Sequence, residues 1–309
     1  MVASRDAPAP ERVPPAGGPP PSAVPGPGRR WRVLQFPVTR IALDAAAVVA
    51  FTGALERAAP RLGLAYGSGP ALVFGVLLCA GVLALYAALV RLVERRDPVE
   101  LHSRGAARLL GLGALGGAGL FGATMAVLWA IGAWRLDGRG AAGPGAVAAA
   151  VVSALTAGCV EEVLMRGVLF RIVEEYLGSW IALGASALFF GLAHVFNPGA
   201  GVVSTLAIAL EAGVLLAAAF MWTRRLWAVI GLHAAWNFVE GGVFGASVSG
   251  YAAPGILAGR FRGGAVLTGG AFGPEASLVA VAWCLAAGAT LAWLARRDGL
   301  VVRPVWRRG

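Results

Sequence analysis

The chain contains no lysine and few charged residues of either sign. Only 14% of its 309 residues are Asp, Glu, Lys or Arg, whereas 58% are hydrophobic, and the mean hydropathy is +0.73. Typical soluble domains carry about 25% charged residues. The composition therefore excludes an ordinary soluble globular protein and predicts a polytopic membrane protein.

Cysteine is equally scarce. Cys79, Cys159 and Cys284 lie in apolar segments at unrelated spacings, which excludes a disulfide framework and a cysteine metal site.

The net charge of +10 comes from 26 arginines, which outnumber the 16 acidic residues. They stand in short clusters between apolar segments, as the positive-inside rule for membrane proteins requires. We therefore predict no nucleic-acid partner.

The apolar segments are long enough to cross a bilayer, which takes about 20 residues per helix. We predict an all-α, polytopic integral membrane helical bundle of about eight transmembrane helices. Their expected ranges are 38–56, 70–92, 109–134, 145–172, 179–196, 200–222, 226–245 and 276–295.

The arginines also predict how the bundle is oriented. Sorted by the alternating sides that eight helices imply, nineteen arginines fall on the side of the N-terminus and six on the opposite side. This bias places both termini in the cytoplasm. The arginine-only, alanine- and glycine-rich usage hints at a GC-rich bacterial genome, so the predicted location is the bacterial inner (cell) membrane.

Four regions follow along the chain. Residues 1–28 contain nine of the 18 prolines and no apolar run, so we expect a disordered cytoplasmic tail. Residues 29–144 hold the first three predicted helices. Residues 145–295 hold the remaining helices and the polar motifs described below. Residues 296–309 form a basic cytoplasmic tail.

The first polar motif is "CVEEVLMRGVLF", residues 159–170. Ionisable residues at membrane depth cost about 2.5–3.5 kcal/mol each on insertion scales and usually mark function. Glu162 and Arg166 are four residues apart and can form an ion pair on one helix face. Glu161 points about 100° away and lacks that partner. The alternative is a helix end near the headgroups, with all three charges solvated.

Two further motifs carry histidine. In "FFGLAHVFNPG", Phe190 and His194 share a helix face just before an Asn-Pro-Gly turn, and in "GLHAAWNF", His233 and Asn237 are four residues apart. Each motif also has a structural interpretation. His194 is a hydrogen-bonded core residue in that case, and His233 with Asn237 joins neighbouring helices by hydrogen bonds.

Helix geometry links the first two motifs. If the fourth and fifth helices form a hairpin that turns near Gly178, Glu161 and His194 each lie about 25 Å from the turn. They are then level in the membrane. His233 follows Arg225 by only eight residues, so its helix needs a kinked or partly submerged start.

The order of these motifs resembles a known family. Glu-Glu-x-x-x-Arg, Phe-x-x-x-His and His-x-x-x-Asn on successive helices are similar to the CPBP family, which includes CAAX prenyl-protein endopeptidases and bacteriocin-processing intramembrane proteases. The block "LTGGAFGPEASL", residues 267–278, also looks like that family. The resemblance covers residues 145–295, which are thereby identified as a CPBP-like catalytic region.

The resemblance implies an intramembrane endopeptidase with four catalytic residues. Glu161 looks like the general base that activates a water molecule with help from His194. His233 and Asn237 look like the pair that polarises the scissile carbonyl and stabilises its oxyanion. Peptide hydrolysis needs both groups, a base for the water and donors where negative charge develops.

Three residues look like support for this set. Glu162 and Arg166 would position Glu161 or a substrate group, and Phe190 stands beside them. Asn237 is a poor zinc ligand but a good oxyanion donor, so we favour a mechanism without a metal or other cofactor. Zn²⁺ is the alternative. Its ligands would be Glu161, His194 and His233.

The expected partners are membrane lipid and a membrane-bound protein or peptide substrate. Two other functions stay open at this point: a proton-coupled transporter that uses the intramembrane Glu and His groups, and a non-catalytic membrane immunity or scaffold protein of the same fold. Glu211 and Glu240 could line a substrate path. We expect instead that Glu211 pairs within the bundle and that Glu240 faces the interface.

Overall fold

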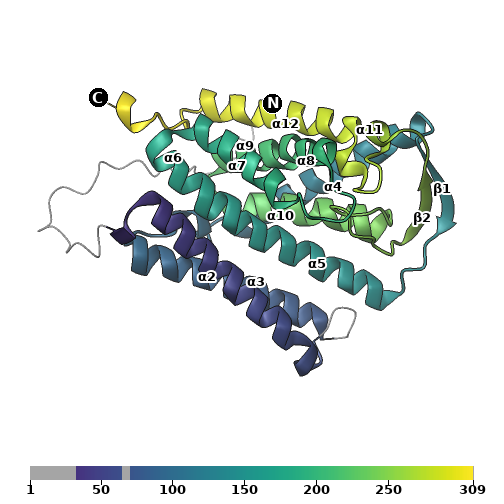
Figure 1. Cartoon of the computed structure of the whole chain (residues 1–309), viewed down its shortest axis with the longest axis horizontal. Coiled ribbons are helices and arrows are strands. Elements are labelled where there is room, and N and C mark those ends of the chain that lie inside the picture. Colours follow the sequence, from purple (N-terminus) through teal and green to yellow (C-terminus); the bar gives the residue numbers. More distant parts are fainter. Residues whose placement is uncertain (1–32, 65–69, 309) are drawn as a thin grey trace, which may run out of the picture.

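The computed structural model describes residues 33–64 and 70–308 as a helical bundle with one small sheet (Figure 1). The predicted tail, residues 1–28, lies outside the described residues. The principal helices are α2 (Pro37–Ala58), α3 (Ala71–Leu89), α4 (Ala106–Ala130), α5 (Pro144–Glu162), α7 (Ser179–Ala193), α10 (Leu226–Asn237) and α12 (Leu278–Arg297).

Several helices continue through π-helical stretches. After α5 the chain runs on through η4 (Val163–Phe170) and α6 (Arg171–Leu177). The next long rod joins α8 (Val202–Ile208), η5 (Ala209–Gly213) and α9 (Val214–Thr223), and α10 continues into η6 (Phe238–Val243). Shorter helical segments are η1 (Ala59–Leu62), η2 (Val90–Glu94), η3 (Val99–Leu101), α11 (Ala265–Thr268), η7 (Pro274–Ala276) and η8 (Val305–Arg307).

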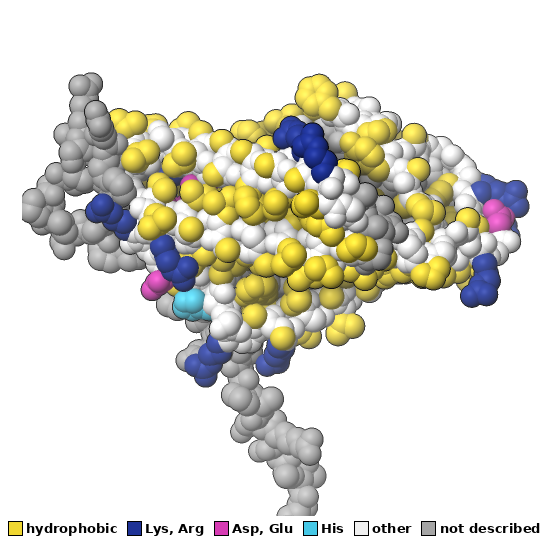
Figure 2. All heavy atoms as spheres, turned by 90° about the horizontal axis from the view of Figure 1, so that it is seen from below, with side chains coloured by type: hydrophobic (Ala, Val, Ile, Leu, Met, Phe, Trp, Pro, Cys, Tyr) yellow, Lys and Arg dark blue, Asp and Glu magenta, His cyan; other side chains and the backbone are white. Residues whose placement is uncertain are grey.

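The described helices include six that are long and apolar enough to cross a membrane, and α7 is a shorter apolar helix. Hydrophobic side chains are spread over the whole face in Figure 2, whereas arginines stand in small separate groups. The predicted class, an all-α integral membrane bundle, is therefore confirmed. The predicted count of eight spanning helices is not.

A two-stranded antiparallel sheet pairs β1 (Trp134–Arg139) with β2 (Leu257–Phe261), and its register shifts between Leu136 and Gly138. The sequence analysis missed this sheet and extended the third helix to residue 134, although α4 ends at Ala130. The two strands are short and far apart in sequence, so hydrophobic periodicity does not reveal their pairing.

Helices α4 and α10 approach each other closely because glycines face each other's backbones. A Cβ on Gly117 would lie 2.1 Å from the carbonyl oxygen of Leu232, and one on Gly231 would lie 2.2 Å from that of Leu110. Neither position can hold a larger side chain without moving a helix. This contact fixes α10, which carries two of the predicted catalytic residues.

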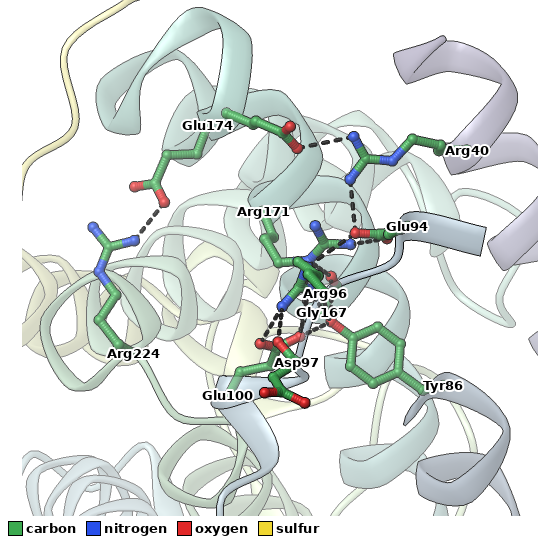
Figure 3. A network of polar contacts seen from close by, with 11 residues as sticks. Arg40, Tyr86, Glu94, Arg96, Asp97, Glu100, Gly167, Arg171, Glu174 and Arg224 are labelled. Atoms are coloured by element: carbon green, nitrogen blue, oxygen red, sulfur yellow. Dashed lines mark hydrogen bonds and ion pairs between the residues drawn. The ribbon is translucent and has the colours of Figure 1, made fainter. Parts of the chain in front are cut away.

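One end of the bundle holds a buried ionic network (Figure 3). The Glu94 carboxylate pairs with three arginines, Arg40 at 2.7 Å, Arg96 at 3.0 Å and Arg171. Arg96 also pairs with Glu100 at 2.7 Å. Burial opposes ionisation of Glu100, but hydrogen bonds from Arg96 outweigh it and lower the pKa of this carboxyl. The network ties α2 and α3 to the rod that contains α5.

The same end also gathers the later loops. Arg224 pairs with Glu174, and Arg308 donates hydrogen bonds to the carbonyl oxygens of Glu174 and Glu175 at 3.4 and 2.7 Å. Loops that the arginine count assigned to one side of the membrane therefore meet at one end of the structure.

We predict that Gly117→Ala weakens the packing of α4 on α10. Overpacking of this kind costs about 1–3 kcal/mol, so the midpoint of thermal unfolding in detergent should fall. Gly119→Ala is the matched control, because an added Cβ there meets nothing within 4 Å and alanine favours a helix by about 1 kcal/mol. Equal midpoints for the two variants would contradict the close helix contact.

Candidate functional site

A hollow inside the bundle brings the polar motifs together. Five of the seven residues singled out from the sequence line it: Glu161, Phe190, His194, His233 and Asn237. The other lining residues are Ile208, Glu211, Ala212, Leu215, Leu216, Leu232, Trp236, Ser249 and Glu275. The hollow thus lies among α7, the loops before α12 and three long helical rods, namely α5–η4–α6, α8–η5–α9 and α10–η6.

Glu161 and His194 face each other across this hollow. Glu161 Oε2 and His194 Nε2 are 3.8 Å apart, too far for a direct hydrogen bond. His194 Nδ1 lies 2.7 Å from the carbonyl oxygen of Phe190, so Nδ1 carries the proton in the neutral ring, and Nε2 of that ring is an acceptor. Two acceptors at this separation are suited to one bridging water molecule that donates to both.

The hairpin explains why they meet. Gly178 turns the chain between α6 and α7 with a positive φ of 81°, a conformation that glycine adopts without strain. The two helices then run back alongside each other, and His194 follows the last residue of α7. The predicted turn at Gly178 and the predicted level of the two residues agree with this arrangement.

The buried pair predicted from the sequence is present. Arg166 Nη1 lies 2.9 Å from Glu162 Oε1, and both side chains are completely buried. Arg166 Nη2 donates hydrogen bonds to the carbonyl oxygens of Ala212 and Gly213 at 3.2 and 3.0 Å. The headgroup alternative, in which these charges are solvated, does not describe this geometry.

Glu162 has a second partner, because His233 Nδ1 lies 2.9 Å from the same Oε1. An ionised carboxylate only accepts hydrogen bonds, so His233 donates from Nδ1 and its Nε2 is left for the hollow. Glu162 therefore contacts His233, whereas the sequence analysis assigned it to support Glu161 or a substrate group.

Phe190 packs against the other polar side chains. Its ring centroid lies 4.8 Å from that of His194 and 5.9 Å from that of His233. The guanidinium carbon of Arg166 stands 5.0 Å from the same centroid, within the range of a cation–π interaction. One aromatic ring thereby restricts the positions of both histidines and the arginine.

His233 and Asn237 lie one turn apart on α10. The start of this helix is covered by protein, because Leu226 is fully buried and Arg225 Nη2 donates to the carbonyl oxygen of Arg104 at 2.6 Å. The depth of this start in the membrane, which the sequence predicts to be partly submerged, stays a prediction. His233 can reach the hollow although it stands only two turns into α10.

Each of the three rods changes from α-helix to π-helix beside the hollow. The π-helix η4 begins directly after Glu162, η6 begins directly after Asn237, and η5 contains Glu211. Isolated π turns inside α-helices are frequent at functional sites. Here they stand next to residues that the motifs identified independently.

The sequence analysis did not identify Ser249 and Glu275 as parts of the site. Glu275 lies inside the block at residues 267–278, whose resemblance was noted without a role for any residue. Glu211 also lines the hollow, and its Oε1 accepts a hydrogen bond from the Cys284 thiol at 3.5 Å.

The expectation that Glu240 faces the interface is wrong. Its side chain is fully buried and accepts a hydrogen bond from Trp236 Nε1 at 3.1 Å. Its backbone position near the end of an apolar run suggested exposure, but the segment around residues 246–275 covers it.

The described residues do not form a ready zinc site. Within residues 33–64 and 70–308, no group of three or more His, Cys, Asp or Glu side chains is arranged to hold a metal ion. Of the alternative ligands, Glu161 and His194 face each other. His233 binds Glu162 through Nδ1 and keeps Nε2 for the hollow, as a metal-bound histidine also does. The absence of a metal and the alternative of Zn²⁺ both stay predictions.

The fold and the hollow define an integral membrane helical protein with a buried Glu/His site. Residues 143–239 match the family model "Type II CAAX prenyl endopeptidase Rce1-like". No curated protein and no solved structure matches the chain. The match includes all three motifs, so it confirms the family resemblance inferred from them and supports a protease at the general level.

We predict that Arg166→Ala destabilises the protein, because it leaves Glu162 buried without its guanidinium. Breaking a buried pair from one side costs about 3–5 kcal/mol, which should lower the midpoint of thermal unfolding in detergent. The control is Arg297→Ala, since Arg297 pairs with Asp298 at 3.1 Å with its side chain 53% exposed, and exposed pairs contribute at most about 1 kcal/mol. Similar midpoints for both variants would refute the structural importance of the buried pair.

Proposed function

We propose that this protein is an intramembrane endopeptidase that hydrolyses a peptide bond of a membrane-associated protein or peptide. The observation that carries the proposal is the 3.8 Å approach of Glu161 Oε2 to His194 Nε2 in a hollow that His233 and Asn237 also line. The match of residues 143–239 to a family of CAAX endopeptidases supports the same reaction class.

The first step is activation of water between Glu161 and His194. A water that donates one proton to each acceptor is oriented and made more nucleophilic. Glu161 removes its proton as the oxygen attacks the scissile carbonyl, in the manner of general base catalysis. The carboxylic acid thus formed then returns the proton to the leaving amine, which completes hydrolysis.

His233 and Asn237 stabilise the oxyanion that forms on the attacked carbonyl. Asn237 offers its side-chain amide, and His233 offers Nε2–H when its ring carries both protons. In an apolar surrounding such donors interact strongly with developing charge and need little reorganisation.

Glu162 and Arg166 act on this second pair. The Glu162 carboxylate accepts a hydrogen bond from His233 Nδ1 and orients the ring so that Nε2 is left for the hollow. Arg166 holds the Glu162 carboxyl in place through their 2.9 Å ion pair. Phe190 restricts both histidine rings by contact.

We further propose that the enzyme lies in the bacterial inner membrane with both termini in the cytoplasm. The support is the distribution of arginines and the meeting of the corresponding loops at one end of the bundle. Its partners are then membrane lipid and a substrate that reaches the hollow from the bilayer. A membrane-bound peptide or a transmembrane segment of another protein fits this access better than a soluble protein.

We predict that Glu161→Ala abolishes cleavage while the protein still inserts into the membrane. The Glu161 side chain is 32% exposed and faces the His194 imidazole at 3.8 Å. Its loss therefore removes no buried ion pair. The measurement is comparative proteomics of membranes that carry the wild type or the variant. A new peptide terminus should appear only with the wild type.

The rival functions give different results in the same experiment. A non-catalytic scaffold would leave the cellular phenotype of Glu161→Ala and His194→Ala unchanged. A proton-coupled transporter would lose solute flux in these variants without any change in peptide termini. Either outcome would contradict the protease.

We also predict that the activity of the purified protein is independent of metal. The base and the oxyanion donors proposed above supply the chemistry without one, so excess chelator followed by dialysis should leave the cleavage rate unchanged. Loss of activity on chelation, restored by added Zn²⁺, would instead favour the metalloprotease mechanism.

A further inference from the structure

Ser249 has a backbone conformation that its surroundings must enforce. Its φ is +48°, in the left-handed region that L-residues other than glycine adopt only at a cost in free energy. The other two non-glycine residues with positive φ, among those the structure describes, are Arg95 and Arg224, which end helices, where this conformation is common.

Ser249 and Gly250 instead form the tip of a tight turn. Val248 and Tyr251 exchange two backbone hydrogen bonds of 2.9 Å across it, and Gly250 also has a positive φ, of 89°. Both central residues of a type I′ turn need positive φ, which favours asparagine or glycine at the first position. The turn alone therefore does not account for a serine at this position.

Two side chains hold the peptide groups of Ser249. Its N–H donates to Glu275 Oε1 at 2.8 Å, and its carbonyl oxygen accepts from Asn197 Nδ2 at 3.0 Å. Both contacts come from distant parts of the chain. Together they form what we call the Ser249 clamp, which consists of Ser249, Glu275 and Asn197.

Gly250 strengthens the clamp from the next position. Its N–H donates to the carbonyl oxygen of Phe272 at 2.6 Å, and a Cβ on Gly250 would lie 1.8 Å from the carbonyl oxygen of Pro198. The turn is therefore packed directly between the loop after α7 and the loop before α12.

One side of the clamp reaches His194. Asn197 N–H donates to the carbonyl oxygen of His194 at 3.1 Å, so the two residues belong to the same turn at the end of α7. Fixing the Asn197 side chain fixes this turn, and with it the distance between the His194 imidazole and Glu161.

The other side of the clamp is anchored in the core. Glu275 is 2% exposed, and its N–H points to Glu240 Oε1 at 3.4 Å. Glu240 in turn accepts from Trp236, the residue before Asn237. Both Ser249 and Glu275 line the hollow that holds Glu161 and His194.

We propose that Glu275 is a positioning residue for the hydrolysis: through the backbone of Ser249 and the side chain of Asn197, it holds the turn that sets His194 opposite Glu161. This inference rests on the proposed function. It assigns a role to a residue outside the segment that matches the family model, which ends at residue 239.

The test asks whether a second substitution, Ser249→Gly, restores the activity that Glu275→Ala loses. Glu275→Ala removes the acceptor for Ser249 N–H, so the strained turn should relax and the cleavage rate should fall about 100-fold, the size expected for a misplacement of about 1 Å. Glu275→Gln retains an acceptor and should stay within about threefold of the wild type. Ser249→Gly removes the strain, so the double variant Ser249→Gly/Glu275→Ala should regain at least tenfold, and a merely structural loss elsewhere would not be restored.

A second readout does not depend on hydrolysis. The chain has three histidines, His102, His194 and His233, so imidazole ¹⁵N spectra of the full protein in detergent contain few signals, assignable with His194→Asn and His233→Asn. Glu275→Ala should shift or broaden the His194 signals and leave those of His102 in place. The double variant should restore them.

The inference is overturned if Glu275→Gln is as inactive as Glu275→Ala, if Ser249→Gly restores nothing, or if the His194 signals of Glu275→Ala equal those of the wild type. Wild-type protein that cleaves nothing would contradict the proposed function alone. The spectra would still decide whether Glu275 positions His194.

Discussion

The buried pair of Glu162 and Arg166 constrains the rest of the site. Both side chains are fully buried, and an unpaired charge in such a place costs several kcal/mol. Glu162 must therefore face the arginine inside the bundle. Glu161 then points to the neighbouring helix face, about 100° away, where His194 ends α7. One electrostatic requirement thus sets the direction of the residue that we propose as the base.

The pair also joins the elements around it. Arg166 binds carbonyl oxygens of η5 and lies over the ring of Phe190, while Glu162 binds His233 on α10. The three rods and α7 are therefore connected through two side chains. The glycine contact between α4 and α10 supplies the complementary constraint, because it fixes the depth and rotation of His233.

Relations within one helix, or across one short turn, could be predicted from the sequence. The four-residue spacing of Glu162 and Arg166 required only the pitch of a helix, and the level of Glu161 and His194 required only the rise per residue from Gly178. These predictions depend on local geometry that every α-helix shares. The all-α class followed in the same way from composition and the length of the apolar runs.

Contacts made by loops between distant segments could not be predicted. Glu275 and Ser249 lie 26 residues apart and meet through a backbone N–H, which no side-chain pattern encodes. Glu240 was misplaced for the same reason, since its cover comes from a later loop. The pairing of β1 with β2 likewise depends on tertiary structure, as strand preferences generally do.

The π turns supply something that a regular helix cannot offer at membrane depth. In an unbroken α-helix each carbonyl already has its N–H partner, and hydrocarbon provides no water to solvate a cation. Where an α-helix changes to a π-helix, the hydrogen bonds change from i→i+4 to i→i+5, and carbonyl oxygens can turn toward a neighbouring helix. Arg166 finds two such oxygens at the end of η5. Backbone carbonyl oxygens at the irregular winding thus take the place of water around the guanidinium. Without them, a guanidinium at this position would need water molecules inside the bundle.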